Sequence, residues 1–346
     1  MRIFLAIPAF AAEHFEAPLK SVAANLPEDA AIDALVSESA MADVGRWLAR
    51  RKAPVRLHPA PDDLNFSHWA QDAVVAANAP DGGLHLYASS NFSRYDDLEA
   101  ARLLARAAGA PLTEVVRPLD GGNLLAVGGR LLVGADLAAL EGDRRPPLDG
   151  GRRRSVLGCD EPALAAEERP AAYLPEGWLE RLRAAIPEGS RQPLFHIDLF
   201  VAPAGEDRFL VGCPRLGAEA LGLVPLDHAD ADRFDAVAER LTAAGATVVR
   251  NPQPMIWVDD PKERRRTWIH LPVNNVLAED CGPGARTVWL PTFGQDHWSP
   301  LETVDRRNAA LWESLGFVVR PVPGMMPFAE NRGALNCMCK VVARAR

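Results

Sequence analysis

The sequence predicts an α/β fold, and the first observation behind this prediction is a succession of helices and strands. Three stretches carry apolar residues at helical spacing and end near a glycine: residues 96–110, 230–246 and 299–316. Each precedes a short run of strand-like composition, namely "LTEVVRPL", "TVVRNP" and "FVVRPVP". Helices that alternate with strands along the chain are typical of an α/β protein.

The second observation is that five stretches of the chain share one form. Each has a polar residue or a cysteine ahead of an apolar run, and four continue through a turn into another apolar run, as a β-hairpin does. The leading residues are Asp72, Asp120, Asp198, Asn274 or Asn275, and Cys337. The fifth stretch, "LNCMCKVVARAR", is cut short by the end of the sequence. The recurrence predicts an internal repeat around an axis, with the leading residues facing one cavity. A coincidence of unrelated hairpins is the alternative.

Composition bounds the class of protein. The chain has 346 residues, 48% of them hydrophobic, which suffices for a sizeable core in one or two domains. The formal net charge of −8 argues against a nucleic-acid partner and suits a cationic substrate. No run approaches the roughly 20 apolar residues of a membrane helix, so we expect no membrane partner. Residues 1–15 have a short apolar stretch, which favours a buried first strand over a signal peptide.

The cysteines indicate the redox compartment. There are five of them, an odd number, and they form no pair of CxxC motifs. This pattern favours reduced thiols in the cytoplasm and argues against a zinc ribbon or another metal site. The oligomeric state cannot be read from the sequence, and a homo-oligomer is left open.

Cys337 and Cys339 lie two residues apart near the end of the chain. A cysteine on a late strand is ordinarily a small buried hydrophobic residue, so a catalytic role needs partners. A thiolate nucleophile works with a proton carrier, most often histidine. "FHIDLF" places His196 and Asp198 two residues apart, on one face if this run is a strand. A buried His–Asp pair is either satisfied within the core or used in chemistry.

Two further carboxylates stand ahead of apolar runs. Asp120 precedes Gly121 and Gly122, which allow the backbone to bend or to approach another group closely. Asp72 follows Trp69 by three residues at the entrance of another apolar run. A turn aspartate and a helix-capping aspartate are the ordinary alternatives, and neither residue alone indicates catalysis.

The order of W-x-x-D, an acid before GGN, H-I-D and G-x-x-x-C along the chain resembles the guanidine-modifying enzymes of the pentein superfamily. That superfamily includes agmatine deiminase, arginine deiminase, peptidylarginine deiminase and the arginine:glycine amidinotransferases. The resemblance extends from Trp69 to Cys337. It implies a five-bladed α/β propeller with pseudo-five-fold symmetry, and a single catalytic domain over residues 1–346.

The resemblance also implies roles for individual residues. Asp72 and Asp198 would bind the substrate guanidinium, His196 would be the general acid and base, Asp120 would hold His196, and Cys337 would be the nucleophile. The other residues placed at the substrate are Trp69, Asn123, Asn274 and Arg332.

The sequence departs from the superfamily's usual pattern at three positions. Gln71 stands where arginine usually precedes the first aspartate, Asp120 stands where glutamate is frequent, and Asn336 stands where histidine or arginine often precedes the nucleophile. Cys339 lies where members vary, and we interpret it as structural. These departures bear on the identity of the substrate more than on the chemistry.

The implied reaction agrees with the residue types. A guanidinium is planar and cationic, so paired hydrogen bonds from two carboxylates suit it. Attack by the Cys337 thiolate would give a thiouronium intermediate that water, activated by His196, would hydrolyse to a ureido product and ammonia. This reaction needs no metal and no organic cofactor.

Other functions stay open at this point. An amidinotransferase would use the same covalent step, a pentein binding module would use none, and a cysteine amidase of another fold would need only Cys337 and His196. The far end of the substrate is undefined, and Arg332 or the arginines of residues 151–154 could bind a carboxylate there. Residues 141–155, rich in Arg, Gly and Pro, are predicted to form an exposed loop, with a lid as the alternative.

Overall fold

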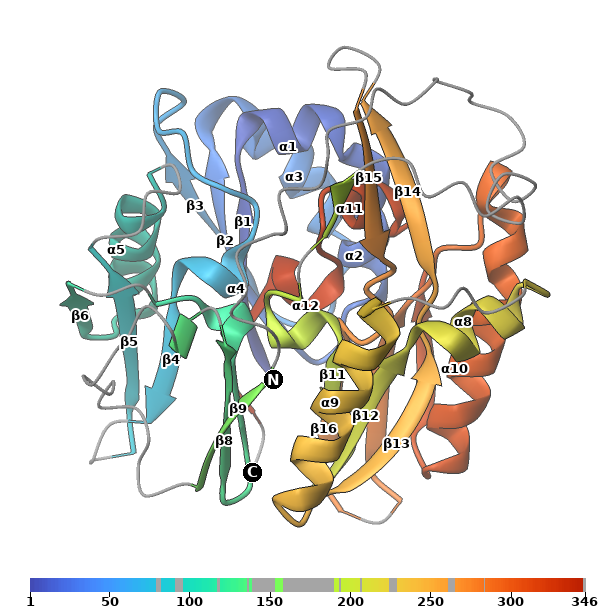
Figure 1. The fold of residues 1–346 in the computed structure, drawn as a ribbon. Coiled ribbons are helices and arrows are strands. Elements are labelled where there is room, and N and C mark those ends of the chain that lie inside the picture. Colours follow the sequence, from blue (N-terminus) through green and yellow to red (C-terminus); the bar gives the residue numbers. More distant parts are fainter. Residues whose placement is uncertain are drawn as a thin grey trace. The chain divides into compact units, whose positions relative to one another are not determined.

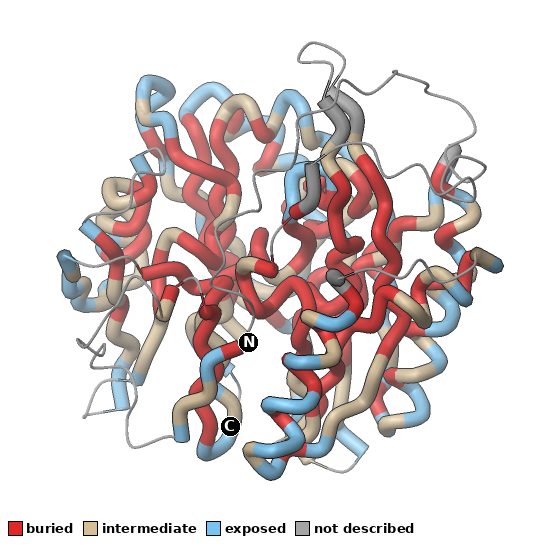
Figure 2. Tube along the Cα trace, in the orientation of Figure 1, coloured by how far each residue is buried: buried red, intermediate tan, exposed pale blue. Residues whose placement is uncertain are grey.

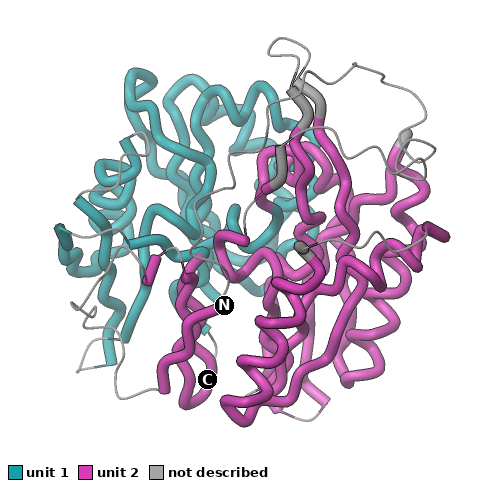
Figure 3. The backbone as a smooth tube through the Cα atoms, in the orientation of Figure 1, with its two compact units in different colours: residues 1–122, 140–150, 334–346 teal, residues 123–139, 151–333 magenta. Residues whose placement is uncertain are grey.

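The structure is a computed structural model of the chain (Figure 1). It describes residues 1–78, 82–90, 96–116, 119–135, 137–138, 153–157, 190–192, 194–205, 207–223, 229–260, 265–282 and 284–344. The chain divides into two compact units, which Figure 3 colours separately. Unit 1 comprises residues 1–122, 140–150 and 334–346, and unit 2 comprises residues 123–139 and 151–333.

Unit 1 contains two sheets. Its strands are β1 (Arg2–Ile7), β2 (Ala31–Ser37), β3 (Val55–Ala60), β4 (Val75–Asn78), β5 (Leu84–Ser89), β6 (Leu112–Val115) and β19 (Cys339–Ala343). One sheet has the order β19-β1-β2-β3, and the other has the order β4-β5-β6. The helices are α1 (Ala9–His14), α2 (Glu16–Asn25), η1 (Glu38–Ala40), α3 (Met41–Leu48), α4 (Ala70–Ala73), α5 (Asp97–Ala108) and α12 (Leu335–Met338).

Unit 2 contains four sheets, with the orders β7-β8-β9, β11-β12-β13, β16-β17-β18 and β10-β15-β14. Its first strands are β7 (Leu124–Val127), β8 (Arg130–Gly134), β9 (Arg153–Leu157), β10 (Ser190–Arg191), β11 (Val201–Pro203) and β12 (Arg208–Cys213). The later strands are β13 (Thr247–Pro252), β14 (Met255–Asp260), β15 (Arg265–His270), β16 (Leu277–Asp280), β17 (Arg286–Pro291) and β18 (Val318–Val322). The helices are η3 (Ile197–Leu199), α8 (Pro214–Ala220), α9 (Ala229–Ala243), η4 (Asp296–Leu301), α10 (Glu302–Ser314) and α11 (Met326–Glu330). The turn η2 (Gly121–Asn123) joins the two units.

One arrangement of three strands recurs five times. An antiparallel pair is followed by a third strand that runs parallel to the second member of the pair. The five sets are β4-β5-β6, β7-β8-β9, β11-β12-β13, β16-β17-β18 and β19-β1-β2. The internal repeat predicted from the sequence is therefore confirmed in the strand pairing.

The fifth set shows how the stretch "LNCMCKVVARAR", which has no second strand after it in the sequence, still forms a hairpin-like pair. Its first strand, β19, pairs antiparallel with β1, which comes from the other end of the chain. β1 also pairs in parallel with β2, so it is a central strand, as the apolar start of the sequence predicts. Figure 2 shows β1 and β2 buried along most of their length.

The three predicted helices form because each carries one apolar face. In α9, buried residues recur every three or four positions, at Ala231, Phe234, Val237, Ala238 and Leu241. The same spacing in α5 places Leu104 in the core of unit 1, and in α10 it places Trp312 in a core of unit 2. The helices end where the sequence predicts, because a glycine with positive φ follows each of them.

The Arg-rich segment was predicted as one exposed loop over residues 141–155, and this prediction was wrong at its end. Arg153, Arg154 and Ser155 belong to β9, which pairs in parallel with β8 and completes the second set of strands. The strand was missed because β-branched residues are few around "RRRS". The remainder of the predicted loop lies outside the described residues, as does Cys159.

Candidate active site

The predicted site residues share one position in the repeat. Each set of strands begins directly after a short turn, and the turn carries the residue of interest. Asp72 lies in α4 before β4, Asp198 lies in η3 before β11, and Cys337 lies in α12 before β19. Asp120 directly precedes η2 before β7, and Asn275 closes a hydrogen-bonded turn on Pro272 before β16. The repeat therefore assigns an equivalent backbone position to three carboxylates, one amide and one thiol.

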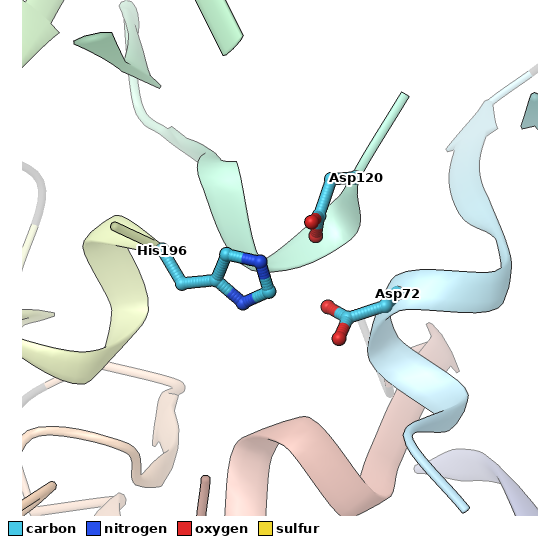
Figure 4. Close-up of side chains that lie close together, drawn as sticks. All are labelled: Asp72, Asp120 and His196. Atoms are coloured by element: carbon cyan, nitrogen blue, oxygen red, sulfur yellow. The ribbon is translucent and has the colours of Figure 1, made fainter. Parts of the chain in front are cut away.

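Within unit 1, Asp72 and Asp120 form a pair of neighbouring carboxylates. Both side chains are buried, with 5% and 4% exposure, and an oxygen of each lies within 4.8 Å of the other carboxylate. The backbone N–H of Gly122 donates to Asp120 Oδ1 at 3.0 Å and to Asp72 Oδ1 at 3.3 Å. Figure 4 shows the two carboxylates pointing into the same space. Two negative charges this close favour a cation between or beside them.

Position 121 must be glycine because the backbone of α4 lies directly against it. A Cβ placed on Gly121 would lie 1.9 Å from the backbone oxygen of Gln71, which no side chain could accommodate. The Gln71 side chain also donates from Nε2 to the Gly121 oxygen at 3.0 Å. The prediction that "DGG" permits a close backbone approach is confirmed, and Gln71 fastens that approach.

Cys337 also belongs to unit 1, where α12 packs directly against α4. The nucleophile predicted from the sequence and Asp72 are therefore brought onto two contacting turns. Cys337 is buried, with 2% exposure. The sequence pattern suggested a strand at this position, but the strand begins only at Cys339.

The two neighbouring thiols have different surroundings. Cys339 is fully buried in β19, and burial raises the pKa of its thiol, although the positive charge of Arg51 acts in the opposite direction. A buried thiol with a raised pKa forms little thiolate and is chemically inert. This agrees with a structural role for Cys339.

Trp69 stands beside an aromatic cluster of unit 1. Its ring centroid lies 4.0 Å from that of His68, and His68 in turn contacts the rings of Phe15 at 5.1 Å and Phe10 at 5.8 Å. His68 is buried and Trp69 is half-buried directly ahead of α4. The cluster fixes the entry to α4, which carries Asp72.

In unit 2, His196 occupies an unusual backbone conformation. Its φ of 52° lies in the left-handed region, which a residue with a Cβ seldom adopts. The residue is buried, and its carbonyl oxygen accepts the N–H of Leu199, which begins a tight turn. The prediction that His196 and Asp198 lie on a strand was wrong, because the strand β11 begins only at Val201. Strained backbone of this kind is concentrated at functional sites.

Neutral amides hold the turn that carries Asp198. Asn275 donates from Nδ2 to Asp198 Oδ2 at 2.9 Å. The Nδ2 group of Asn274 donates instead to the Phe200 oxygen at 2.8 Å and to Asn251 Oδ1 at 3.1 Å. The sequence left open whether Asn274 or Asn275 is the leading residue of this stretch. In the structure, Asn275 binds Asp198, and Asn274 binds Phe200 and Asn251.

A second layer of amides continues this support. Gln253 donates from Nε2 to the oxygens of Leu199 and Leu271, each at 2.9 Å. Asn308 donates to the oxygens of Pro252 and Val304, and its own oxygen accepts from Asn251 at 2.8 Å. Sequence reasoning missed Gln253 and Asn308, because a single amide on an apolar face gives no local signal.

Two further predicted residues, Asn123 and Arg332, lie at or next to the ends of the residue ranges that make up unit 2. Asn123 is buried at the end of η2, directly before β7, and β7 packs against η3 within unit 2. Arg332 is exposed after α11 and has a φ of 64°. Each of them adjoins a point where the chain passes between the units, after Gly122 and after Gly333. These two of the four crossing points thus fall inside the motifs that carry the resemblance.

The described part of the chain contains no helix that combines the length and the apolar character needed to cross a membrane. No protein-family model and no curated protein matches the sequence.

Solved structures do resemble the fold. Agmatine deiminase of C. jejuni has a TM-score of 0.63 and 14% identity, with 98% of this chain and 92% of that chain covered. Agmatine deiminase of Enterococcus faecalis has a TM-score of 0.63 and 12% identity over the same shares. Together with the five recurring sets of strands, these likenesses confirm the predicted pentein-type α/β fold.

Proposed function

We propose that the protein is a cysteine-dependent hydrolase that converts a guanidino compound to a ureido product and ammonia. The observation that carries this proposal is the equivalent placement of Asp72, Asp198 and Cys337 in turns that open three of the five strand sets. A chain that only kept the fold would have no reason to bury a thiol, a histidine and three carboxylates at these positions.

Substrate binding is assigned to the carboxylates. Asp72 and Asp198 accept hydrogen bonds from the N–H edges of the guanidinium, and the positive charge of the substrate offsets the repulsion around Asp72. Asn275 keeps the Asp198 carboxylate oriented for this contact. Because the amide of Asn274 has two acceptors within unit 2, its proposed contribution is to support the turn at Phe200.

The covalent step is assigned to Cys337. Its thiolate attacks the central carbon of the guanidinium and forms a C–S bond, and a tetrahedral adduct results. His196 donates a proton to one nitrogen, the C–N bond breaks, and ammonia leaves. His196 then removes a proton from water, whose oxygen adds to the thiouronium carbon. The C–S bond breaks, which releases the ureido product and the thiolate.

Asp120 is assigned to hold His196 in the correct orientation and to stabilise its imidazolium. Chain connectivity supports this role, since Asp120 lies three residues before Asn123, and the strand that follows Asn123 packs against η3. The left-handed backbone of His196 fixes the direction from which its side chain leaves the turn. A location in the cytoplasm is part of the proposal, since an odd number of cysteines favours reduced thiols.

The test is an assay of purified protein on a panel of guanidines. Agmatine comes first because solved structures named agmatine deiminase share the fold, followed by arginine, methylated arginines and a peptidyl arginine. Ureido product and ammonia should appear in equal amounts, and Cys337→Ser should produce neither.

The alternatives give different results in the same assay. An amidinotransferase would form product only when an amine acceptor such as glycine is added, and it would release the amine portion of the substrate in place of ammonia. A binding module would bind guanidines in calorimetry without any conversion. Either result would overturn the proposed hydrolysis.

A further inference from the structure

Unit 1 buries one lysine at its candidate site. The chain has 38 lysine and arginine residues, and only four of them are lysines. Lys340 belongs to β19, three residues after Cys337, where it is paired with Phe4 of β1. It is 7% exposed, which is rare for a lysine unless negative or polar groups surround the ammonium.

The ammonium group of Lys340 lies against the turn that follows Asp120. A Cβ placed on Gly121 would be 3.2 Å from Lys340 Nζ, so the missing side chain leaves the space beside the ammonium. The N–H of the next residue, Gly122, is the group that both Asp120 and Asp72 share. Lys340 and the two carboxylates therefore lie beside the same short stretch of backbone, Gly121 and Gly122.

Other described charges lie on neighbouring elements of unit 1. The charged or titratable groups on the elements that pack against β19 or α4 are Arg2 on β1, Cys337 on α12, Cys339 on β19, and Asp97, Glu99, Arg102 and Arg106 on α5. Arg2 donates to Asp33, and Asp97 accepts from Ser67. Arg102 and Arg106 both donate to Glu99. The described arginines Arg2, Arg102 and Arg106 thus donate to Asp33 or Glu99.

We propose that Lys340 is the internal counter-cation of the Asp72–Asp120 pair, and that it keeps both carboxylates ionised before the substrate arrives. Lysine suits this task because its ammonium is a compact charge with three hydrogen-bond donors. Lys340 is a positioning residue, which acts on the substrate through the two carboxylates. Its role in catalysis rests on the proposed guanidine hydrolysis, whereas its effect on the carboxylates does not.

The direct test is nuclear magnetic resonance of the full chain, labelled with ¹³C at the aspartate carboxyl carbons. Spectra of Asp72→Asn and Asp120→Asn assign the two signals. In Lys340→Met and Lys340→Gln, the higher of the two carboxyl titrations should move up by about one pH unit or more, because a nearby positive charge has been removed. Lys340→Arg restores the charge and should move the titration back toward that of the wild type.

The control is Lys52→Met, which removes an exposed lysine that is paired with Glu28. This variant should titrate like the wild type. Unchanged Asp72 and Asp120 titrations in both Lys340→Met and Lys340→Gln would overturn the proposal.

A second measurement needs no change at position 340. With ¹³C at the ε carbons, the four lysines give four signals, and the Lys340 signal should follow the titration of the carboxylate pair. In Asp72→Asn this response should shift or disappear. A Lys340 signal that is insensitive to pH across the carboxylate titration would contradict the proposal even if every Lys340 variant failed to fold.

Activity separates this inference from the proposed function. For a guanidine that the protein hydrolyses, Lys340→Met should move the acid limb of kcat/KM to higher pH, and a purely structural role would lower the plateau without moving the limb. If no guanidine is hydrolysed, the proposed function fails, and the carboxyl titrations still decide the role of Lys340.

Discussion

The two units hold their parts of the candidate site by different means. In unit 1, the side chains of Asp72, Asp120 and Lys340, all ionisable, lie beside the backbone of Gly121 and Gly122. In unit 2, Asp198 is held by Asn275, and the turn behind it is fastened by neutral amides. Under the proposed function, unit 1 would provide charge and the nucleophile, whereas unit 2 would provide orientation. Substitutions in the two units should therefore change activity and stability in different ways.

The largest effect is expected at Cys337, the proposed nucleophile in unit 1. Cys337→Ser replaces sulfur by a hydroxyl that is far less acidic, so turnover should fall on the order of 10⁴-fold or more with the fold retained. Cys339→Ser is the matched control and should keep most of the activity, since Cys339 is fully buried. A haloacetamidine, which resembles the guanidinium, should label Cys337 in peptide mapping. Equal losses in both variants, or labelling of Cys339, would sink the assignment.

The next effect separates binding from chemistry. Asp120→Asn should lower the single-turnover rate about 10²- to 10³-fold, because the histidine loses its orienting carboxylate. Asp72→Asn and Asp198→Asn should instead weaken substrate binding by about 2–5 kcal/mol, roughly 30-fold to several-thousand-fold. Calorimetry and rapid-quench kinetics measure the two quantities. If Asp120→Asn abolished binding and left the rate of the bound complex normal, Asp120 would be a substrate ligand.

Two aspartates, Asp33, which is buried, and Asp305, which is half-buried, extend the comparison to stability. In unit 1, burial raises the pKa of Asp33. Hydrogen bonds from Arg2, His58 and Arg56 outweigh this and leave the pKa below its usual value. In unit 2, burial raises the pKa of Asp305 to about 6, against the backbone N–H groups of Phe293 and Gly294 that donate to it.

The two aspartates should respond to pH in opposite directions. The folded state holds Asp33 ionised, so its stabilisation is present above about pH 4 and is lost as the pH falls below that value. The folded state favours protonated Asp305, so stability declines as the pH rises from about 4 through 6.

Substitution by asparagine should reveal this contrast at pH 7.5. Asp33→Asn breaks a buried ionic cluster and should lower the free energy of unfolding by about 3 kcal/mol. Asp305→Asn removes a poorly solvated charge and keeps an acceptor oxygen, so it should cost nothing or stabilise the protein. Urea denaturation at pH 5 and pH 7.5 measures both. Equal destabilisation by the two changes at pH 7.5 would refute the contrast.

The smallest effect is expected from the amide support of unit 2. Asn275→Ala removes the donor to Asp198 Oδ2, and the loss of one such hydrogen bond should raise KM roughly ten-fold. The value of kcat should change less, because the nucleophile and His196 are untouched. Asn331→Ala is a suitable control, since the Asn331 amide only caps an exposed turn at Pro327. A loss in kcat with KM unchanged would assign Asn275 to the chemistry itself.

Periodicity in the sequence was sufficient to predict the repeat and the main helices. Buried residues at helical spacing in α9, and hairpins that follow Asp72 and Asp198, depend on patterns longer than ten residues, which sequence records well. The candidate site residues were chosen by their order along the chain. Their local structure was not predicted, because α4, η3 and α12 are single turns of three or four residues, too short to show any period.

Other features could not be predicted from the sequence, for physical reasons. The positive φ of His196 is imposed by the surrounding structure, since histidine has no intrinsic preference that would announce it. The pairing of β19 with β1 joins opposite ends of the chain, and no local signal connects them. A clue to Lys340 was present, namely a rare lysine within an apolar run directly after two cysteines. Its significance required knowing that Gly121 lies beside it.

The pairing of β1 with β19 has a consequence for biosynthesis. On the ribosome, β1 emerges at the start of the described chain, and β19 emerges at its end, so β1 waits with one edge unpaired while everything between is made. The strand that closes this edge directly follows the turn of Cys337 and contains Lys340. A product of premature termination would thus lack its thiol, its buried ammonium and its closing strand together. Under the proposed function, such a product would be inactive, and it would carry an open strand edge that chaperones and proteases can recognise.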